Sequence, residues 1–161
     1  MIKIYCNDKL KNVLKNNKVE NYLPAYNGES AGLDLYNTGD DVIIPYIGNK
    51  IKTPKTLIPT GLHIAVPKGY VALIQERGSV VKTNFKVRAG VIDCGYTGEI
   101  FVNLVNLSEF REFGCINKGS KLPVQLVVVK CDNNFEIVSE NEYLNLSDSF
   151  NRKAGQIGSS D

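Results

Sequence analysis

The sequence predicts an all-β sandwich or barrel with little helix. Short segments rich in Val, Ile, Leu and Tyr recur along the chain at regular spacing. Gly, Pro, Asn and Asp stand between these segments, as is typical of strands joined by turns. The 161 residues suit one domain with a single core, and no internal repeat, linker or second domain is visible.

The first third of the chain predicts three strands and one short helix. Met1–Ile4 is expected to begin a strand, and residues 9–15 have a weak helical pattern that allows one or two turns. A turn-rich approach then leads to a strand at Ser30–Tyr36. Val42–Pro45 is expected to be a short strand that proline closes.

Residues 57–67 form an extended segment in which Leu62, Ile64 and Val66 share one face. His63 lies on the other face and is expected to be structural, because no catalytic partner pattern accompanies it. Pro67–Gly69 predicts a turn into another strand at Tyr70–Ile74.

Residues 89–100 are interpreted as a hairpin whose glycine-marked turn carries Asp93. A carboxylate at the rim of a β-scaffold can orient a water or a sugar hydroxyl. Aspartate is also common in turns for its own backbone bonding, so this stretch alone leaves both interpretations open.

The last third predicts strands at 100–107 and 122–129, the second of them after Gly119. From Ser147 the chain is polar and rich in Gly and Ser, with Arg152 and Lys153 side by side. Such a tail is often a frayed terminus, or it can wrap a polyphosphate with its arginine and flexible amides.

Composition excludes several functions. The net charge of +2 gives no reason to expect a nucleic-acid or membrane partner, and no apolar stretch approaches the length of a membrane span. The four cysteines are widely spaced and there is one histidine, which argues against a structural zinc site. We expect reduced thiols and a cytoplasmic location.

Five short motifs follow one another along the chain, and each alone is weak. In sequence letters they are AGLDL, ERGS after a PKGY turn, GVIDCGYTG, a strand with QL, and RKAGQIGSS. In this order they resemble the motifs of the trimeric dUTP pyrophosphatases (dUTPases), from about Leu23 to the C-terminus. The third motif is the most specific and the fifth departs most from the family.

This resemblance implies a jelly-roll-like β fold and one dUTPase domain over residues 1–161, with 1–22 as its least typical part. It also implies a homotrimer whose active sites are shared between subunits, with residues 147–161 as a flexible arm that crosses to a neighbour. The implied reaction is Mg²⁺-dependent hydrolysis of dUTP to dUMP and pyrophosphate, which limits uracil in DNA and supplies dUMP for dTTP synthesis.

The resemblance also assigns roles to individual residues. Asp93 would hold the attacking water and the 3′-hydroxyl, so that the water meets the α-phosphorus in line. Tyr96 would pack under the deoxyribose and exclude a 2′-hydroxyl. The backbone of Gly90, Val91 and Ile92 would recognise the uracil edge.

The other motifs would bind the phosphates and the metal. Asp34 would contact Mg²⁺ through water, because this ion commonly keeps several waters. The remaining substrate-binding residues implied are Arg77, Gly78, Ser79, Gln125, Arg152, Ile157, Gly158, Ser159 and Ser160.

Three departures from the family pattern stand out. The second motif has Glu76 in place of proline and Gly78 in place of serine, so a phosphate-binding hydroxyl is missing and a negative charge is added. The fourth is one residue longer than usual and contains Pro123. The fifth has Ile157 where an aromatic usually stacks on uracil, and we expect this loss of stacking to weaken substrate binding.

Two rival interpretations remain. A dCTP deaminase shares the fold, but its general base is a glutamate where this chain has Asn103, whose amide takes no proton from water. The other is a dUTPase-like regulatory protein that binds nucleotide with little activity. The altered second and fifth motifs allow it, but Asp93, Tyr96, Arg77 and Arg152 argue against it, because a pure binder has no need of a carboxylate that positions water.

Overall fold

The computed structural model describes residues 2–25, 28–47, 57–110, 112–132 and 134–148. It is mostly β-strand with two short α-helices, which confirms the predicted fold class. The elements in order are β1 (Lys3–Cys6), α1 (Asp8–Asn16), β2 (Gly32–Tyr36), β3 (Val42–Ile44), β4 (Leu57–Ala65), β5 (Tyr70–Glu76), the 3₁₀ helix η2 (Gly78–Lys82), β6 (Phe85–Arg88), β7 (Val91–Ile92), β8 (Glu99–Asn106), β9 (Gly114–Ile116), β10 (Lys121–Lys130) and α2 (Glu140–Asp148).

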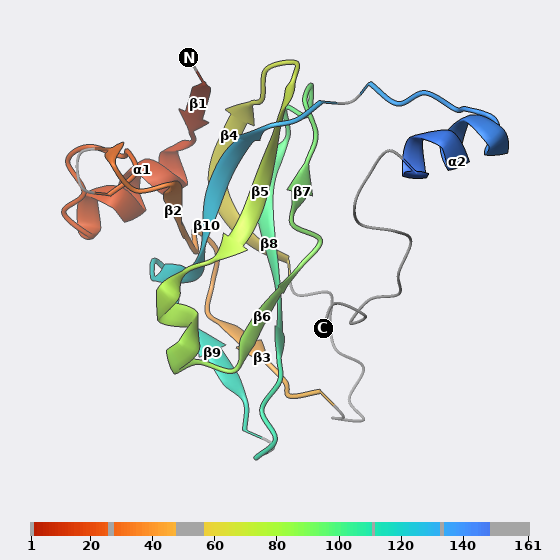
Figure 1. Cartoon of the computed structure of the whole chain (residues 1–161). Coiled ribbons are helices and arrows are strands. Elements are labelled where there is room, and N and C mark those ends of the chain that lie inside the picture. Colours follow the sequence, from red (N-terminus) through yellow and green to blue (C-terminus); the bar gives the residue numbers. More distant parts are fainter. Residues whose placement is uncertain (1, 26–27, 48–56, 111, 133, 149–161) are drawn as a thin grey trace.

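Two four-stranded sheets enclose the core (Figure 1). One has the strand order β1-β4-β8-β6, the other has the order β2-β10-β5-β7, and all their pairings are antiparallel. A small third sheet pairs β3 with β9. Most buried apolar side chains come from strands of both large sheets, and α1, β3 and β9 add others, so the two large sheets pack face to face as in a sandwich.

Helix α1 confirms the weak helical pattern at residues 9–15. The Asn7 side chain caps the helix by accepting from the Leu10 amide at 3.0 Å. Leu10 and Leu14 are buried in the core, one turn apart on the same face. Packing of this face against β4 explains why so short a segment is helical.

The predicted hairpin over residues 89–100 is wrong. Its two arms do not pair with each other: β7 pairs with β5, and β8 pairs with β4 and β6. The chain between them crosses from one sheet to the other. The turn at Pro67–Gly69 does the same, because β4 and β5 also belong to different sheets. Strong strand pairing within each sheet thus overrides the local hairpin signal.

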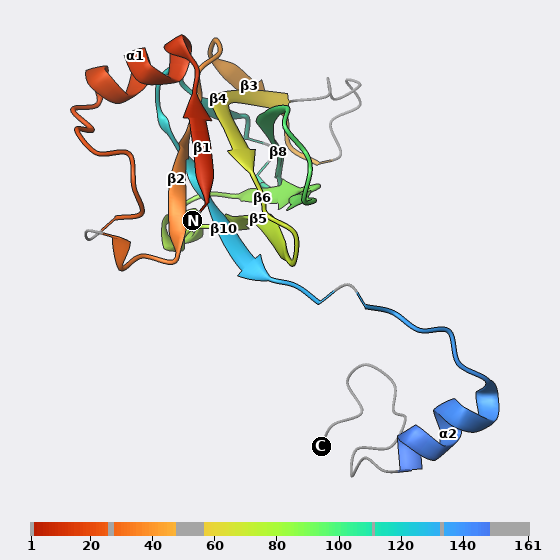
Figure 2. The same ribbon diagram turned by 90° about the horizontal axis from the view of Figure 1, so that it is seen from above.

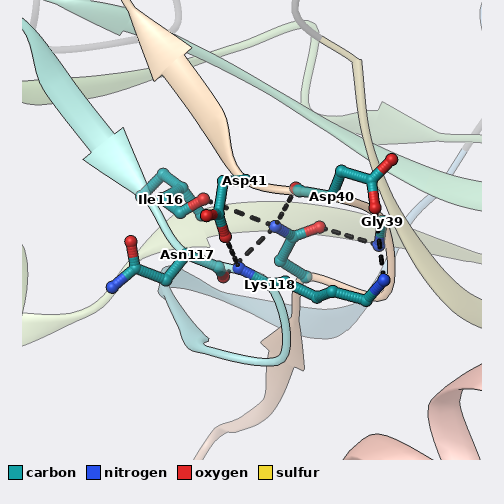
Figure 3. A network of polar contacts seen from close by, with 7 residues as sticks. Gly39, Asp40, Asp41, Ile116, Asn117 and Lys118 are labelled. Carbon is teal, nitrogen blue, oxygen red and sulfur yellow. Dashed lines mark hydrogen bonds and ion pairs between the residues drawn. The ribbon is translucent and has the colours of Figure 1, made fainter.

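A polar network fixes the turn after β2 to the turn before β10 (Figure 3). The buried Asn37 amide donates to the Asp40 carbonyl at 2.8 Å and to the Asn117 carbonyl at 3.2 Å. The Lys118 amide donates to Asp41 Oδ1 at 2.6 Å, and its ammonium pairs with Asp40 at 3.2 Å. These contacts hold the start of β10 beside β2.

The C-terminal part of the described chain lies away from the sandwich (Figure 2). Helix α2, which the sequence does not predict, exposes Tyr143, Leu144 and Leu146. Phe135 and Ile137, in the segment before it, are almost fully exposed. The expected flexible arm at 147–161 lies largely outside the described residues.

Candidate active site

Three of the motif strands lie side by side in one sheet. Gln125 of β10 is opposite Asp34 of β2 on one side and Gln75 of β5 on the other. Between Lys121 and Gln125 the register of β10 against β2 shifts, which marks a bulge. Pro123 lies within it, and a bulge is one of the few sheet positions that tolerate proline. The extra length in the fourth motif is therefore absorbed as a bulge.

The Asp34 carboxylate is held by two cations. Arg77 Nε lies 2.7 Å from Asp34 Oδ1, and Lys121 Nζ donates to Asp34 Oδ2 at 2.7 Å. The Asp34 side chain is 18% exposed, so these pairs are screened less than those on an open surface. The hydrogen bond to Asp34 raises the pKa of Lys121 above its ordinary value. We call Asp34, Arg77 and Lys121 the charge cluster.

The backbone beneath this cluster is anchored by a tyrosine. The Tyr22 hydroxyl donates to the carbonyl oxygen of Asp34 at 2.6 Å. Burial raises the pKa of Tyr22 well above its usual range, so the hydroxyl stays a neutral donor. This hydrogen bond fixes the position of the Asp34 backbone in β2.

The second motif enters η2 directly after β5. The Arg77 amide donates to the Pro123 carbonyl at 3.0 Å, which joins this motif to the bulge of β10. Ser79 is exposed, and open space surrounds the position of a Cβ at Gly78. Glu76 turns away from the cluster: its Oε1 accepts from the Val87 amide at 3.4 Å and lies 3.5 Å from Lys86 Nζ.

The third motif forms a turn at the other edge of the same sheet. Asp93 and Tyr96 are exposed, and the Tyr96 amide donates to the Asp93 carbonyl at 3.3 Å. Gly95 has φ +83°, a conformation that favours glycine. The Tyr96 hydroxyl donates to the Glu99 carbonyl at 2.8 Å, which folds the ring back over its own turn.

A cavity of about 230 Å³ lies beside this turn. Strand β7 is an edge strand, so one row of its backbone N–H and C=O groups has no partner strand in the sheet. The Gly90 carbonyl is already used, since it accepts from the Ile74 amide at 2.7 Å. The free row suits recognition of a planar polar edge. Among the lining residues are Ile74, Val91, Asp93, Tyr96, Ile100 and Phe101.

The two groups of predicted residues do not meet within one chain. Asp34 belongs to β2 at one edge of the sheet, and Asp93 follows β7 at the opposite edge. Three strand spacings of about 4.8 Å each separate these edges, roughly 14 Å in all. Asp34, Arg77 and Gln125 come together, and Asp93 and Tyr96 lie with Gly90, Val91 and Ile92. Arg152, Ile157, Gly158, Ser159 and Ser160 lie outside the described residues.

Lys121 is a site residue that the sequence interpretation missed. A lysine at the first position of a strand is normally a solvated end, and the register shift that brings it to Asp34 has no sequence signal of its own. A second cavity, of about 560 Å³, lies between α1 and the turns at 38–40 and 118–119. None of the predicted site residues lines it, so it is not part of the candidate site.

The donor set for a divalent metal is sparse. Within the part of the chain that the structure describes, no three His, Cys, Asp or Glu side chains cluster as metal ligands. Asp34 fits a role through water, because an ionised carboxylate offers about four acceptor positions and the two cations occupy two of them. Such a site suits an ion held mainly by substrate phosphates.

Comparison with known proteins finds one matching family and several similar proteins. The dUTPase family model matches residues 19–161. The deoxyuridine 5′-triphosphate nucleotidohydrolase of Dictyoglomus turgidum is 40% identical over 104 residues, 62% of this chain and just under two thirds (66%) of that protein. The enzyme of the same name from Rickettsia typhi is 37% identical over 124 residues, 73% of this chain and 78% of that protein.

A mutant dUTPase from phage phi11 of S. aureus has a similar structure, with a TM-score of 0.62 at 22% identity. The match covers 87% of this chain and 97% of that one. At this identity the likeness concerns the fold.

Proposed function

This chain belongs to the dUTPase family, and we propose that it hydrolyses dUTP to dUMP and pyrophosphate. The observation that carries the proposal is the turn at residues 93–96. It presents an exposed carboxylate at the rim of a cavity whose wall includes the edge strand β7. A base that presents a carbonyl acceptor beside an N–H donor on one edge, as uracil does at O4 and N3, suits the free backbone row of β7.

In this proposal Asp93 is the catalytic residue. Its carboxylate orients a water for in-line attack on the α-phosphorus and accepts a proton from it. The Tyr96 ring, tied to the Glu99 carbonyl, packs beneath the deoxyribose. A ring fixed in this way leaves little room for a 2′-hydroxyl, which discriminates against UTP.

The phosphate chain would lie against the charge cluster, the exposed Ser79 and Gln125. Arg77 supplies charge and several N–H donors, which is what phosphoryl transfer needs most. The outward turn of Glu76 toward Lys86 removes the objection that its negative charge repels phosphate. We propose that the C-terminal residues complete the phosphate site and that Ile157 covers the base. The phosphate-binding residues of this segment are Arg152, Gly158, Ser159 and Ser160.

We further propose Mg²⁺ as the cofactor, with Asp34 holding it through water. The phage phi11 dUTPase, which has a similar fold, coordinates a structural Mg(II) ion, a role distinct from the one proposed here. When bound, the ion neutralises phosphate charge and polarises the reacting phosphoryl group.

A homotrimer with shared sites is the assembly that we propose. The separation of Asp34 and Asp93 by the width of a sheet supports it, because catalysis needs both groups at one substrate. The exposed apolar side chains of Phe135, Ile137 and Leu144 also favour a C-terminal segment that packs on a neighbouring copy.

We also propose a cytoplasmic location for the protein. Cys6, Cys94 and Cys115 are free thiols, as in a reducing compartment. No helix in the described ranges is long and apolar enough to cross a membrane.

A pyrophosphate-release assay with Mg²⁺ and dUTP tests the function, and dTTP, dCTP and UTP define its specificity. Of these four nucleotides, we expect the protein to hydrolyse only dUTP. Asp93→Asn should lower kcat at least a hundredfold, within the range for a positioned proton acceptor, with an unchanged melting temperature. Asp8→Asn, which alters an exposed aspartate paired with Lys11, is the control.

Absence of pyrophosphate with dUTP would favour the regulatory binding protein, and ammonia release from dCTP would favour the deaminase. Full turnover in Asp93→Asn would remove Asp93 from the mechanism.

A further inference from the structure

The charge cluster carries one more positive charge than negative. Asp34 contributes one carboxylate, and Arg77 and Lys121 contribute one cation each. The nearby carboxylate of Glu76 faces Lys86 instead, so it leaves this balance unchanged. Without Lys121, the cluster would be a neutral Asp34–Arg77 pair.

Lys121 is also held in place by more than one contact. Its ammonium lies 5.8 Å from the centre of the Tyr36 ring, the residue opposite it in the β2–β10 pairing. On the other side of the bulge, Gln125 of the same strand lies opposite Asp34 in the pairing of β10 with β2. The Lys121 side chain is 41% exposed, which leaves N–H donors for a ligand.

We propose that Lys121 is a positioning residue for the triphosphate: it holds Asp34 from the side opposite Arg77 and gives the cluster its net positive charge. This inference rests on the proposed function. With both carboxylate oxygens engaged, Asp34 stays in one orientation and Arg77 keeps its place at the entrance of η2. The surplus charge attracts the polyanionic substrate.

The test compares Lys121→Met and Lys121→Arg with the unaltered full-length protein. Lys118→Met is the matched control, because Lys118 forms an exposed ion pair with Asp40 just before the same strand. KM and kcat for dUTP are measured at saturating Mg²⁺ and at several KCl concentrations. Binding of the α,β-imido analogue of dUTP and of uncharged deoxyuridine is measured by calorimetry.

We expect Lys121→Met to raise KM and the Kd of the analogue about tenfold, the lower end of the cost of losing a hydrogen bond to a charged group. Its kcat should change less than about threefold, since the lost interaction serves binding. Lys121→Arg should restore KM. Deoxyuridine binding should be unchanged, and KM in Lys121→Met should depend less on KCl.

Each other outcome overturns the inference. It fails if Lys121→Met behaves like Lys118→Met, if arginine does not rescue it, if kcat alone falls, or if deoxyuridine binding weakens equally. A protein that does not hydrolyse dUTP would refute the proposed function separately. The calorimetric comparison would still decide the role of Lys121 in that case.

Discussion

Arg77 approaches Asp34 through Nε, which lies 2.7 Å from Oδ1. The two residues are 43 positions apart in the sequence. Asp34 lies in β2, Arg77 directly follows β5, and β10 lies between these two strands. The pair therefore links the first motif to the second across the fourth.

Replacing Asp34 by asparagine should break the charge cluster. The amide has one acceptor oxygen, so its N–H₂ group would face one of the two cations, donor against donor. We expect kcat/KM for dUTP to fall at least tenfold, the effect of about 1.4 kcal/mol of lost transition-state stabilisation. Half-maximal activity should also need more Mg²⁺. Steady-state kinetics over a Mg²⁺ titration checks this, and wild-type values in Asp34→Asn would contradict it.

Gly78→Ser should stabilise the fold and lower KM for dUTP. Open space surrounds a Cβ at this position, and φ of Gly78 lies outside the left-handed region, so serine fits without strain. Loss of glycine should stabilise the fold by about 0.4–1 kcal/mol through the unfolded state. The new hydroxyl should also lower KM for dUTP. Gly78→Ala is the control, with the same gain in melting temperature and an unchanged KM. An unchanged KM in Gly78→Ser would argue against phosphate binding at this position.

Gly32→Ala should act through Gln125. A Cβ at Gly32 would overlap the end of the Gln125 side chain, which must move. We expect KM for dUTP to rise and stability to fall by no more than about 3 kcal/mol, the upper end of the usual cost of overpacking. In a Gln125→Ala background the same substitution should have no further effect on KM. Additive effects in this double-mutant cycle would show that Gly32 and Gln125 are independent.

Stability should fall as the pH rises above about 10, the ordinary pKa of tyrosine. The pKa of Tyr22 is raised in the folded state, so above this pH the unfolded chain loses a proton that the folded one keeps. The slope from this group is about 1.4 kcal/mol per pH unit. Tyr22→Phe should flatten the slope and cost about 1 kcal/mol at pH 7 for the lost bond to Asp34. Denaturant unfolding at pH 7 to 11 measures both. An equal slope in Tyr22→Phe would exclude Tyr22 as its source.

The sequence predicted the fold class and most strands because alternation of apolar residues is a local property. Leu62, Ile64 and Val66 are buried on the predicted face. The hairpin at residues 89–100 failed because pairing partners are a tertiary property: β5 pairs with β7 and β4 with β8. Strands β6 and β9 have only four and three residues, too short for a clear alternation.

The motifs identified candidate site residues, but they did not predict which side chains contact one another. Its prediction of Asp34 as a metal contact gave no sign that Arg77 and Lys121 already share the carboxylate. Likewise, the direction of Glu76 depends on Lys86 of β6, an element that the sequence did not predict. Side-chain partners across a sheet follow from register, and a bulge changes register without changing composition.

The placement of Asp34 and Asp93 at opposite edges of one sheet has a genetic consequence for the proposed trimer. A subunit damaged at Asp93 still lends an intact Asp34 edge to its neighbour, and the reverse holds for a subunit damaged at Asp34. Two inactive variants, one altered at Asp93 and one at Asp34, should therefore complement each other when they are co-expressed. If the subunits mix at random, about a quarter of the active sites should contain both intact residues.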